Sequence, residues 1–200
     1  MSFSDYKTIS QVQTEYQIVY EEICFITKTK MEISQRFISE LEFNTTTLDA
    51  FSSEAARCEL IILPILREIY KKVASKCSLW IQKSMSYDDK LTGTPDYIVS
   101  KRSSLGKTVL ECPLLILAEA KKNDFDQGWA QCLAELVAAQ KLNQDDSIRL
   151  FGIVTDGKYW EFGKLEKNRF TKNMESFAVD QLPELFGALD FILTFASRQL

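Results

Sequence analysis

Residues 91–131, LTGTPDYIVSKRSSLGKTVLECPLLILAEAKKNDFDQGWAQ, predict the centre of the fold. They contain a first strand that carries Asp96, a turn with a glycine, and a strongly apolar second strand that runs into Glu119, Ala120 and Lys121. Because side chains alternate along a strand, we expect Glu119 and Lys121 on one face and Ala120 in the opposite layer. If the two strands pair, Asp96 joins the charged residues at one end of the hairpin.

The charged residues at this end predict a divalent-metal site. Two carboxylates and an ammonium beside apolar strands lose hydration, which destabilises a protein unless something compensates for it. Asp96, Glu119 and the carbonyl oxygen of Ala120 are hard oxygen ligands of the kind that Mg²⁺ prefers, with water and a substrate phosphate in the remaining positions. Lys121 is placed to orient or help deprotonate the attacking water and to offset charge on the phosphate.

These residues resemble a known family pattern. The Pro95-Asp96 pair, followed after a hairpin-sized gap by Glu119-x-Lys121, is similar to the signature of the PD-(D/E)XK, or restriction-endonuclease-like, nuclease superfamily. A following amphipathic helix that carries Gln131 also matches the pattern of that family. The alternative interpretation is a surface hairpin with solvated ion pairs, which contribute little stability.

The resemblance implies an α/β fold with a restriction-endonuclease-like αβββαβ core, in which helices flank a central mixed sheet. It covers residues 53–164 of one predicted domain, which we divide into an N-terminal helical extension (1–50), the core (51–164) and a C-terminal hairpin and helix (165–200). It further implies an Mg²⁺-dependent endonuclease, with Mn²⁺ as a substitute, that hydrolyses phosphodiester bonds by metal-activated water. DNA is the expected substrate.

Two further residues are assigned to the site through the resemblance. In the family, a glutamate on the first core helix reaches the metal, and Glu54 is our choice because it stands four residues before Cys58 and seven before Ile61, on the predicted buried face. Glu59 is the competitor, and helix capping or solvent exposure is the alternative for both glutamates. Gln131 is expected to support the active site, with a neutral surface amide as its alternative.

Composition limits the class of protein and the kinds of site that this chain can have. The chain has 46% hydrophobic and 26% charged residues, which is typical of a globular protein. It has neither an apolar stretch of roughly 20 residues nor a secretory signal at its start, so we expect no membrane contact and a cytoplasmic location. The five cysteines are scattered without a C-x-x-C pair, which predicts reduced, mostly buried thiols rather than a zinc site or disulfides.

The absence of histidine and the net charge of −4 bear directly on mechanism. Histidine bases, histidine-ligated zinc and Ser/Cys–His pairs cannot operate within this chain alone, whereas carboxylate–metal chemistry can. An acidic chain has no general attraction for nucleic acid, so local cations must contact phosphates. The candidates are Lys101, Arg102, Lys107, Lys121, Lys122, Lys164, Lys167, Arg169 and Lys172.

A second class of function stays open beside the nuclease. A nuclease-like domain that does not cleave can act as a nucleic-acid or protein-binding subunit. The intact set of Asp96, Glu119 and Lys121 counts against this alternative, and the acidic balance of the chain favours it.

The N-terminal part has a helical pattern. Apolar residues recur at alternating three- and four-residue spacing over residues 9–26, which predicts one long helix. Packing of this seam on the same chain is favoured because it spans only about three heptads, and a homodimer is the alternative. Residues 28–49 fit either a strand or a helix, with residues 44–47 as a loop.

The remaining elements follow from caps and periodicity. Ser52 or Ser53 caps a helix with Glu54 in its first turn, and Pro64 is expected to kink or split that helix near residues 60–63. In the apolar strand, Leu115 and Leu117 should face one layer, and Leu114 and Ile116 the other. We also predict strands over residues 79–85, 148–155 and 158–163, a short pair over 168–179, and helices over 125–141, capped by Asp124, and from 181 onward.

Overall fold

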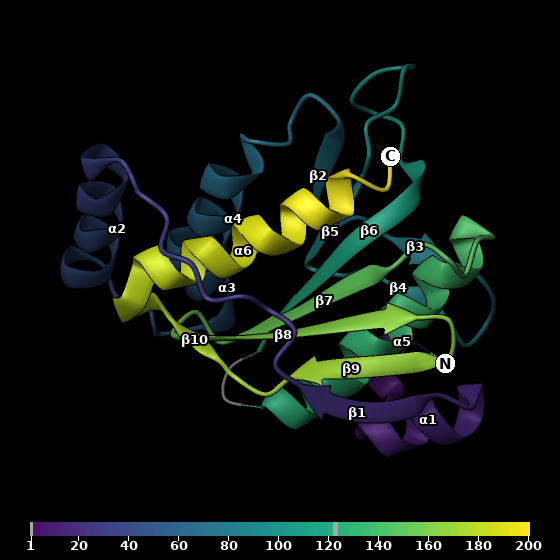
Figure 1. The fold of residues 1–200 in the computed structure, drawn as a ribbon. Helices are drawn as coiled ribbons and strands as arrows, with labels where there is room; N and C mark the ends of the chain where they lie inside the picture. The colour runs from purple at the N-terminus through teal and green to yellow at the C-terminus, as the bar shows by residue number, and fades with distance from the viewer. Residues whose placement is uncertain (1, 122–123) are drawn as a thin grey trace.

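The computed structural model describes residues 2–121 and 124–200. An eight-stranded mixed sheet forms its centre, with the order β1-β9-β8-β7-β6-β5-β2 and with β10 paired to β8; β3 and β4 form a separate pair (Figure 1). The strands are β1 (Val19–Ile23), β2 (Cys77–Ile81), β3 (Met85–Ser86), β4 (Thr92–Gly93), β5 (Tyr97–Lys101), β6 (Glu111–Ala120), β7 (Leu150–Thr155), β8 (Tyr159–Glu166), β9 (Arg169–Asn173) and β10 (Phe177–Ala178). The helices are α1 (Ile9–Tyr16), α2 (Gln35–Thr47), α3 (Glu54–Arg57), α4 (Leu63–Tyr70), α5 (Phe125–Asn143) and α6 (Leu182–Ser197).

Helices cover both faces of the sheet, so the predicted α/β class is confirmed at that level. On one face, α5 packs against β6, β7 and α1, and their buried side chains form one apolar core. On the other face, α6 crosses β6 and β7 beside α4, and a second core fills that layer (Figure 1). In the part of the chain that the structure describes, no helix is long and apolar enough to cross a membrane.

Strand β6 lies in the middle of the sheet, antiparallel to β5 and parallel to β7, which confirms the predicted central strand. The prediction of its two faces is wrong. Leu114 and Leu117 belong to the core under α5, whereas Leu115 and Ile116 belong to the core under α4 and α6. The pairing register shifts opposite residues 99–100, and a β-bulge of this kind interrupts the alternation of side chains.

The prediction of one helix over residues 9–26 is also wrong. Helix α1 ends at Tyr16, and Gln17 adopts a left-handed conformation with φ of 55°. The chain then enters β1, which pairs in parallel with β9 at the edge of the sheet and leaves Val19 and Ile23 exposed. The three- and four-residue spacing of apolar residues over 9–26 therefore arises from a helix followed by a strand. A continuous helical face that could pair with a second copy of the chain does not form. The homodimer itself stays a prediction.

Residues 44–47, predicted as a loop, continue α2 to its end. The hydroxyl groups of Thr45 and Thr46 donate to the carbonyl oxygens of Leu41 and Glu42, one turn back, at 3.0 and 2.7 Å. These bonds satisfy side chains that otherwise favour turns. The ambiguous segment is therefore helical over α2.

The helix that contains Pro64 is divided just before this proline, as predicted. Ser53 caps α3 by accepting from the backbone N–H of Ala56, and a π-helical segment, Cys58–Ile62, separates α3 from α4. The strand predicted over residues 79–85 is shorter, because Gln82 has φ of 46° and the chain leaves β2 for the small β3–β4 sheet.

The C-terminal half confirms most predicted elements. Helix α5 is capped by Asp124, β7 follows it in parallel with β6, β8 forms a hairpin with β7, and α6 closes the chain. The short pair predicted over residues 168–179 is wrong, because β9 and β10 each pair with β8 instead. The thiols are not mostly buried, since Cys24 and Cys112 are exposed and Cys58 is partly exposed.

Candidate active site at the ends of β5 and β6

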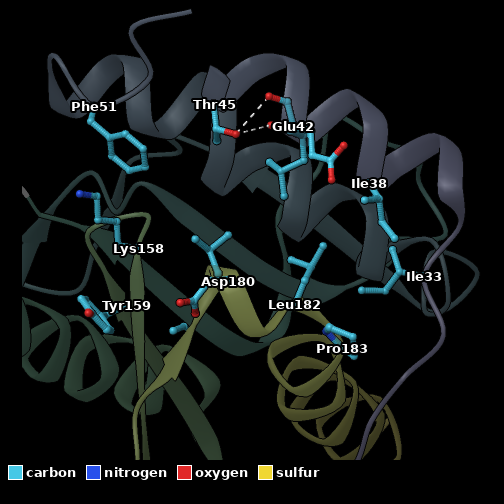
Figure 2. Close-up of a pocket in the computed structure, with 13 residues that line it drawn as sticks. Ile33, Ile38, Glu42, Thr45, Phe51, Lys158, Tyr159, Asp180, Leu182 and Pro183 are labelled. Atoms are coloured by element: carbon cyan, nitrogen blue, oxygen red, sulfur yellow. Dashed lines mark hydrogen bonds between the residues drawn. The ribbon is translucent and has the colours of Figure 1, made fainter. Parts of the chain in front are cut away.

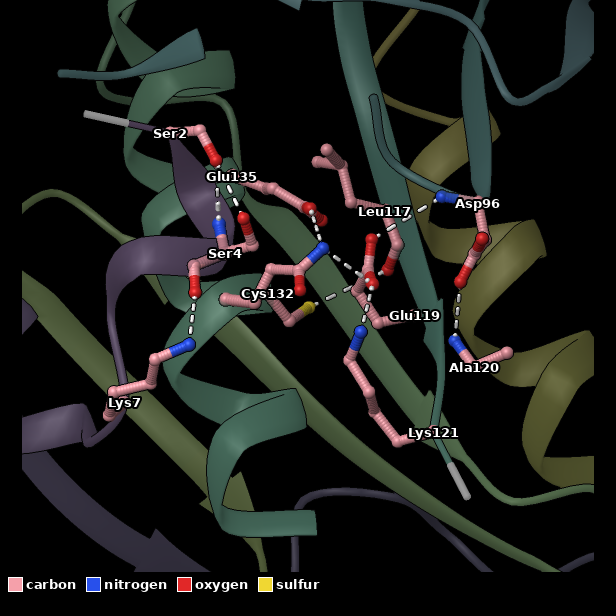
Figure 3. Close-up of polar contacts among 11 residues, drawn as sticks. Ser2, Ser4, Lys7, Asp96, Leu117, Glu119, Ala120, Lys121, Cys132 and Glu135 are labelled. Carbon is pink, nitrogen blue, oxygen red and sulfur yellow. Dashed lines mark hydrogen bonds and ion pairs between the residues drawn. The ribbon is translucent and has the colours of Figure 1, made fainter. Parts of the chain in front are cut away.

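The cross-strand pairing of β5 and β6 brings the two predicted metal ligands together. Tyr97 lies opposite Ala118 in the register, so Asp96 stands beside the end of β6. The backbone N–H of Asp96 donates to Glu119 Oε1 at 3.3 Å, and the N–H of Ala120 donates to Asp96 Oδ2 at 2.8 Å (Figure 3). Each carboxylate is therefore held by the strand that carries the other.

Lys121 and Gln131 complete this group of residues, as the sequence predicted. Lys121 Nζ lies 3.5 Å from Glu119 Oε2, and Ala120 points into the opposite layer, as strand alternation requires. From α5, Gln131 Nε2 donates to the same Glu119 oxygen at 2.8 Å. Glu119 Oε1 thus faces Asp96, while Oε2 is occupied by the amide and the ammonium.

Burial controls the electrostatics of these carboxylates. Desolvation raises the pKa of Asp96, although the N–H of Ala120 and the charge of Lys121 act in the opposite direction. Desolvation, together with the charge of Asp96, raises the pKa of Glu119 to about 7. Burial alone would lower the pKa of Lys121, but the nearby carboxylates, with Glu119 first, raise it. Two carboxylates with raised pKa values form a site that a cation stabilises.

Glu135 is a member of this network that the sequence did not assign to the site. It lies on α5 one turn after Gln131, its exposed fraction is 0%, and its Oε1 accepts from Gln131 Nε2 at 3.1 Å. Desolvation and the charge of Glu119 raise its pKa well above the ordinary value. As a carboxylate, its Oε2 has no donor among the residues that the structure describes; as a neutral group it can donate to Glu119.

Glu54 does not occupy the buried face predicted for it. Its side chain is exposed in the first turn of α3, and Glu59 is exposed as well. The prediction counted back from Cys58 and Ile61, but Cys58 is itself only partly buried and Glu54 is the first residue of α3. The π-helical segment that begins at Cys58 also changes the spacing between Glu54 and the buried Ile61. The charge of Glu54 still acts on Asp96 and Lys121, whereas that of Glu59 acts on Cys58 and Tyr97 instead. Of the two glutamates, Glu54 is therefore the one whose charge acts on the candidate site.

The cations predicted to contact phosphates are dispersed. Lys101 and Arg102 lie at the opposite end of the hairpin, where Lys101 pairs with Glu111 at 2.8 Å. On β8 and β9, Lys172 pairs with Glu161 at 2.9 Å, and Arg169 pairs with Glu21 at 2.7 Å. Of the nine predicted contacts, only Lys121 is a member of the carboxylate network, and Lys122 lies outside the described residues.

The donor set fits Mg²⁺ or Mn²⁺ with open coordination positions better than an enclosed metal. In the described part of the chain, no three His, Cys, Asp or Glu side chains are grouped so that they could hold a metal ion. Asp96 and Glu119 provide two carboxylates, and proteins usually bind Mg²⁺ through one or two carboxylates, with water and substrate phosphate as the other ligands. The carbonyl of Ala120, predicted as a third ligand, stays a prediction.

Comparison with known proteins adds no family to these observations. Neither the protein-family models nor the curated proteins contain a match to this chain. The candidate site therefore depends on its own geometry.

Proposed function

We propose that this protein is a metal-dependent nuclease of the PD-(D/E)XK type, which hydrolyses phosphodiester bonds in nucleic acid, with DNA as the expected substrate. One observation supports this proposal above the others. Asp96 and Glu119 are held by hydrogen bonds between β6 and the start of β5, with Lys121 beside them, where the apolar run of residues 113–118 ends. Fixed, desolvated charges of both signs are arranged for charge that develops during a reaction.

Each residue has a role in this proposal. Asp96 and the Oε1 atom of Glu119 would hold Mg²⁺, which when bound lowers the pKa of a water ligand and offsets phosphate charge. Lys121 would donate hydrogen bonds to the attacking water or to a phosphate oxygen. Gln131 keeps Glu119 in one orientation through its 2.8 Å hydrogen bond, and Glu135 keeps the Gln131 amide in place.

The second candidate function is a nuclease-fold subunit that binds nucleic acid or a protein without cleaving. Three observations favour it: the lack of a three-ligand group among the described residues, the exposed position of Glu54, and the net charge of −4. Such a subunit would bind without needing a divalent cation.

A nicking assay on supercoiled plasmid separates the two candidates. Cleavage is expected with Mg²⁺ or Mn²⁺ and not with chelator, and Asp96→Asn should abolish it while retaining an acceptor for the Ala120 N–H. Asp190→Asn is the matched control, because Asp190 pairs with Lys72 on a different part of the surface. Single-stranded and branched DNA and RNA belong in the same assay. Metal-independent binding without cleavage of any of these substrates would establish the second candidate.

A further inference from the structure

Strand β1 is one edge of the eight-stranded sheet, and its outer side has no neighbouring strand among the described residues (Figure 1). The Val19 N–H and the Ile23 carbonyl form hydrogen bonds of 2.8 and 3.3 Å to the residues just before and just after β9. Alternate residues of a strand direct their backbone groups to opposite sides. Tyr20 and Glu22 therefore direct theirs outward, where they can pair with another strand.

Two apolar side chains lie exposed along this edge. Val19 and Ile23 are 46% and 44% exposed, and they point to the same face of the sheet because they are four residues apart in one strand. Tyr20 points to the opposite face and packs against Phe170 in the core under α5. The edge thus presents an apolar side chain to water at each end of β1, on the face away from α5.

We infer that β1 pairs antiparallel with β1 of a second copy of this chain, about a two-fold axis at Glu21. This register places Val19 of each copy opposite Ile23 of the other, so both exposed apolar side chains gain apolar partners. Tyr20 and Glu22 of opposite copies form hydrogen-bonded pairs, and Glu21 faces its equivalent in a non-hydrogen-bonded pair. Because the same five residues supply both sides of every pair, a second copy is the partner that fits this edge.

The two glutamates of β1 do not prevent this pairing, because each already has a partner. Glu21 accepts from Arg169 at 2.7 Å and from Thr171 at 2.8 Å, so the guanidinium groups of both copies offset the approach of the two Glu21 carboxylates. Glu22 accepts from the Tyr20 hydroxyl, and the register places the partner subunit's Tyr20 opposite Glu22. Each copy therefore compensates the negative charges that it brings to the edge.

The other edge strand, β2, is less suited to pairing. Only Ile81 among its residues is exposed, and the Lys83 ammonium lies 5.4 Å from the centre of the Trp80 ring, where a lysine hinders the addition of a strand. Strand β1 contains neither lysine nor proline, and its register with β9 has no shift. Its five residues form a small interface beside the roughly 1,200 Å² or more of stable complexes, so the dimer should be weak and concentration-dependent.

Sedimentation of the full chain tests this pairing and needs no cleavage. The wild type should change from monomer to dimer as its concentration rises. Val19→Lys/Ile23→Lys places a lysine opposite a lysine at both ends and should stay monomeric, whereas Val19→Lys/Ile23→Glu places a lysine opposite a glutamate and should dimerise. Both double variants lose the same two apolar side chains, so only the arrangement of charge differs. Ile81→Lys on β2 is the control and should dimerise as the wild type does.

A cross-link measures the register directly. In a protein whose exposed Cys24 and Cys112 are replaced by serine, Glu21→Cys should give a disulfide-linked dimer with oxidant. The Cα atoms of such a non-hydrogen-bonded pair lie about 4.5 Å apart, within the range of a disulfide. Glu22→Cys is the matched variant, since Glu22 is the more exposed of the two glutamates. It should not cross-link, because its equivalents are two residues out of register, beyond the roughly 7 Å that a disulfide can span.

A wild type that stays monomeric at every concentration overturns the pairing. So does a Val19→Lys/Ile23→Lys protein that associates as strongly as the wild type, because the copies then meet at another surface. Cross-linking of Glu22→Cys in place of Glu21→Cys overturns the register. Should neither double variant associate, the Glu21→Cys cross-link decides. A β1-dependent dimer that never cleaves keeps the pairing and rejects only the nuclease.

Discussion

The two ends of the β5–β6 hairpin carry the same pair of residue types in different surroundings. At one end, Lys101 Nζ lies 2.8 Å from Glu111 Oε1, and the two side chains are 46% and 29% exposed. At the other end, Lys121 Nζ lies 3.5 Å from Glu119 Oε2, and the side chains are 20% and 1% exposed. The hydrogen bond from Lys101 lowers the pKa of Glu111, whereas burial raises the pKa of Glu119 despite Lys121.

Solvent access, more than the lysine–glutamate distance, therefore determines whether the carboxylate of each pair has a lowered or a raised pKa. Water around the Lys101–Glu111 pair already stabilises both charges, so their ion pair adds little. Around Glu119, water is replaced by Gln131, Glu135 and apolar strands, and one lysine does not compensate for the lost hydration. A further cation should therefore stabilise the buried end of the hairpin. Variants of Lys101 and Glu111 at the exposed end serve as controls for variants of Lys121 and Glu119.

The largest expected effect is on turnover. Lys121→Met keeps the apolar stem and removes the ammonium, so metal and DNA should still bind while the cleavage rate falls roughly 10²–10⁴-fold. Lys101→Met makes the same change at the exposed end and should cleave as the wild type does. Single-turnover cleavage measures both rates. A Lys121→Met protein with the wild-type rate would contradict the role assigned to this lysine.

The second effect is on stability and metal binding at Glu119. Its pKa is raised in the folded protein, so its contribution to stability is fully present below about pH 4.5 and is lost as the pH rises through about 7. Glu119→Gln imitates the neutral acid and should stabilise the chelated protein by about 3 kcal/mol at pH 8, with a flatter pH dependence. It should also abolish Mg²⁺ binding.

Glu111→Gln is the control for that change. The folded-state pKa of Glu111 is lowered, so its contribution is present above the unfolded value and is lost on acidification, which is the opposite direction. Denaturant melts from pH 4 to 8 and calorimetric Mg²⁺ titrations measure both variants. If Glu119→Gln retains the wild-type affinity for Mg²⁺, Glu119 is not a ligand.

A third and smaller effect concerns the orientation of Glu119. Gln131→Ala removes the amide that fixes the carboxylate and should weaken Mg²⁺ binding about tenfold, as the loss of such a supporting partner commonly does. On the same helix, Gln140 donates to the backbone carbonyl of Lys167 at the surface, so Gln140→Ala should not change the affinity. Equal Mg²⁺ affinities of the two variants would show that Gln131 has no orienting role.

The positions of Glu119, Lys121 and Gln131 could be predicted from the sequence, because they depend on strand alternation and on helix capping, which are local properties of the chain. Alternation along an apolar strand put Glu119 and Lys121 on one face, and the helix after Asp124 carried Gln131 back over that face. The helical pattern predicts Glu135 on the same stripe as Gln131, four residues later, but a stripe alone does not assign it to the site. Only its complete burial and its bond with Gln131 in the fold show that it belongs to the network.

Elsewhere, tertiary contacts and rare backbone geometry overrode the sequence pattern. The pattern over residues 9–26 predicts one helix, but residues 19–23 pair in parallel with β9 instead, and α1 ends before the left-handed Gln17. The α-helical spacing that predicts a buried Glu54 fails, because Glu54 is the first residue of α3 and the π-helical segment interrupts the spacing to Ile61. A groove near Phe51 is lined by residues of α2, β8 and α6, which are far apart in the sequence (Figure 2). A pattern within one of these segments cannot predict that they line the same groove.

The smallest expected effect is the coupling within the exposed pair itself. A double-mutant cycle with Lys101→Met and Glu111→Gln isolates that coupling, because each single change removes the ion pair and leaves the strand pairing intact. Thermal melts should show additive changes, and 0.5 M NaCl should make no further difference, since water and salt already screen both charges. The parallel cycle with Lys121→Met and Glu119→Gln should be clearly non-additive: once Glu119 is neutral, the removal of the Lys121 ammonium no longer leaves an unpaired buried charge. Equal coupling in the two cycles would mean that burial does not distinguish the two ends of the hairpin, and the case for a cation site at Asp96 and Glu119 would lose its electrostatic basis.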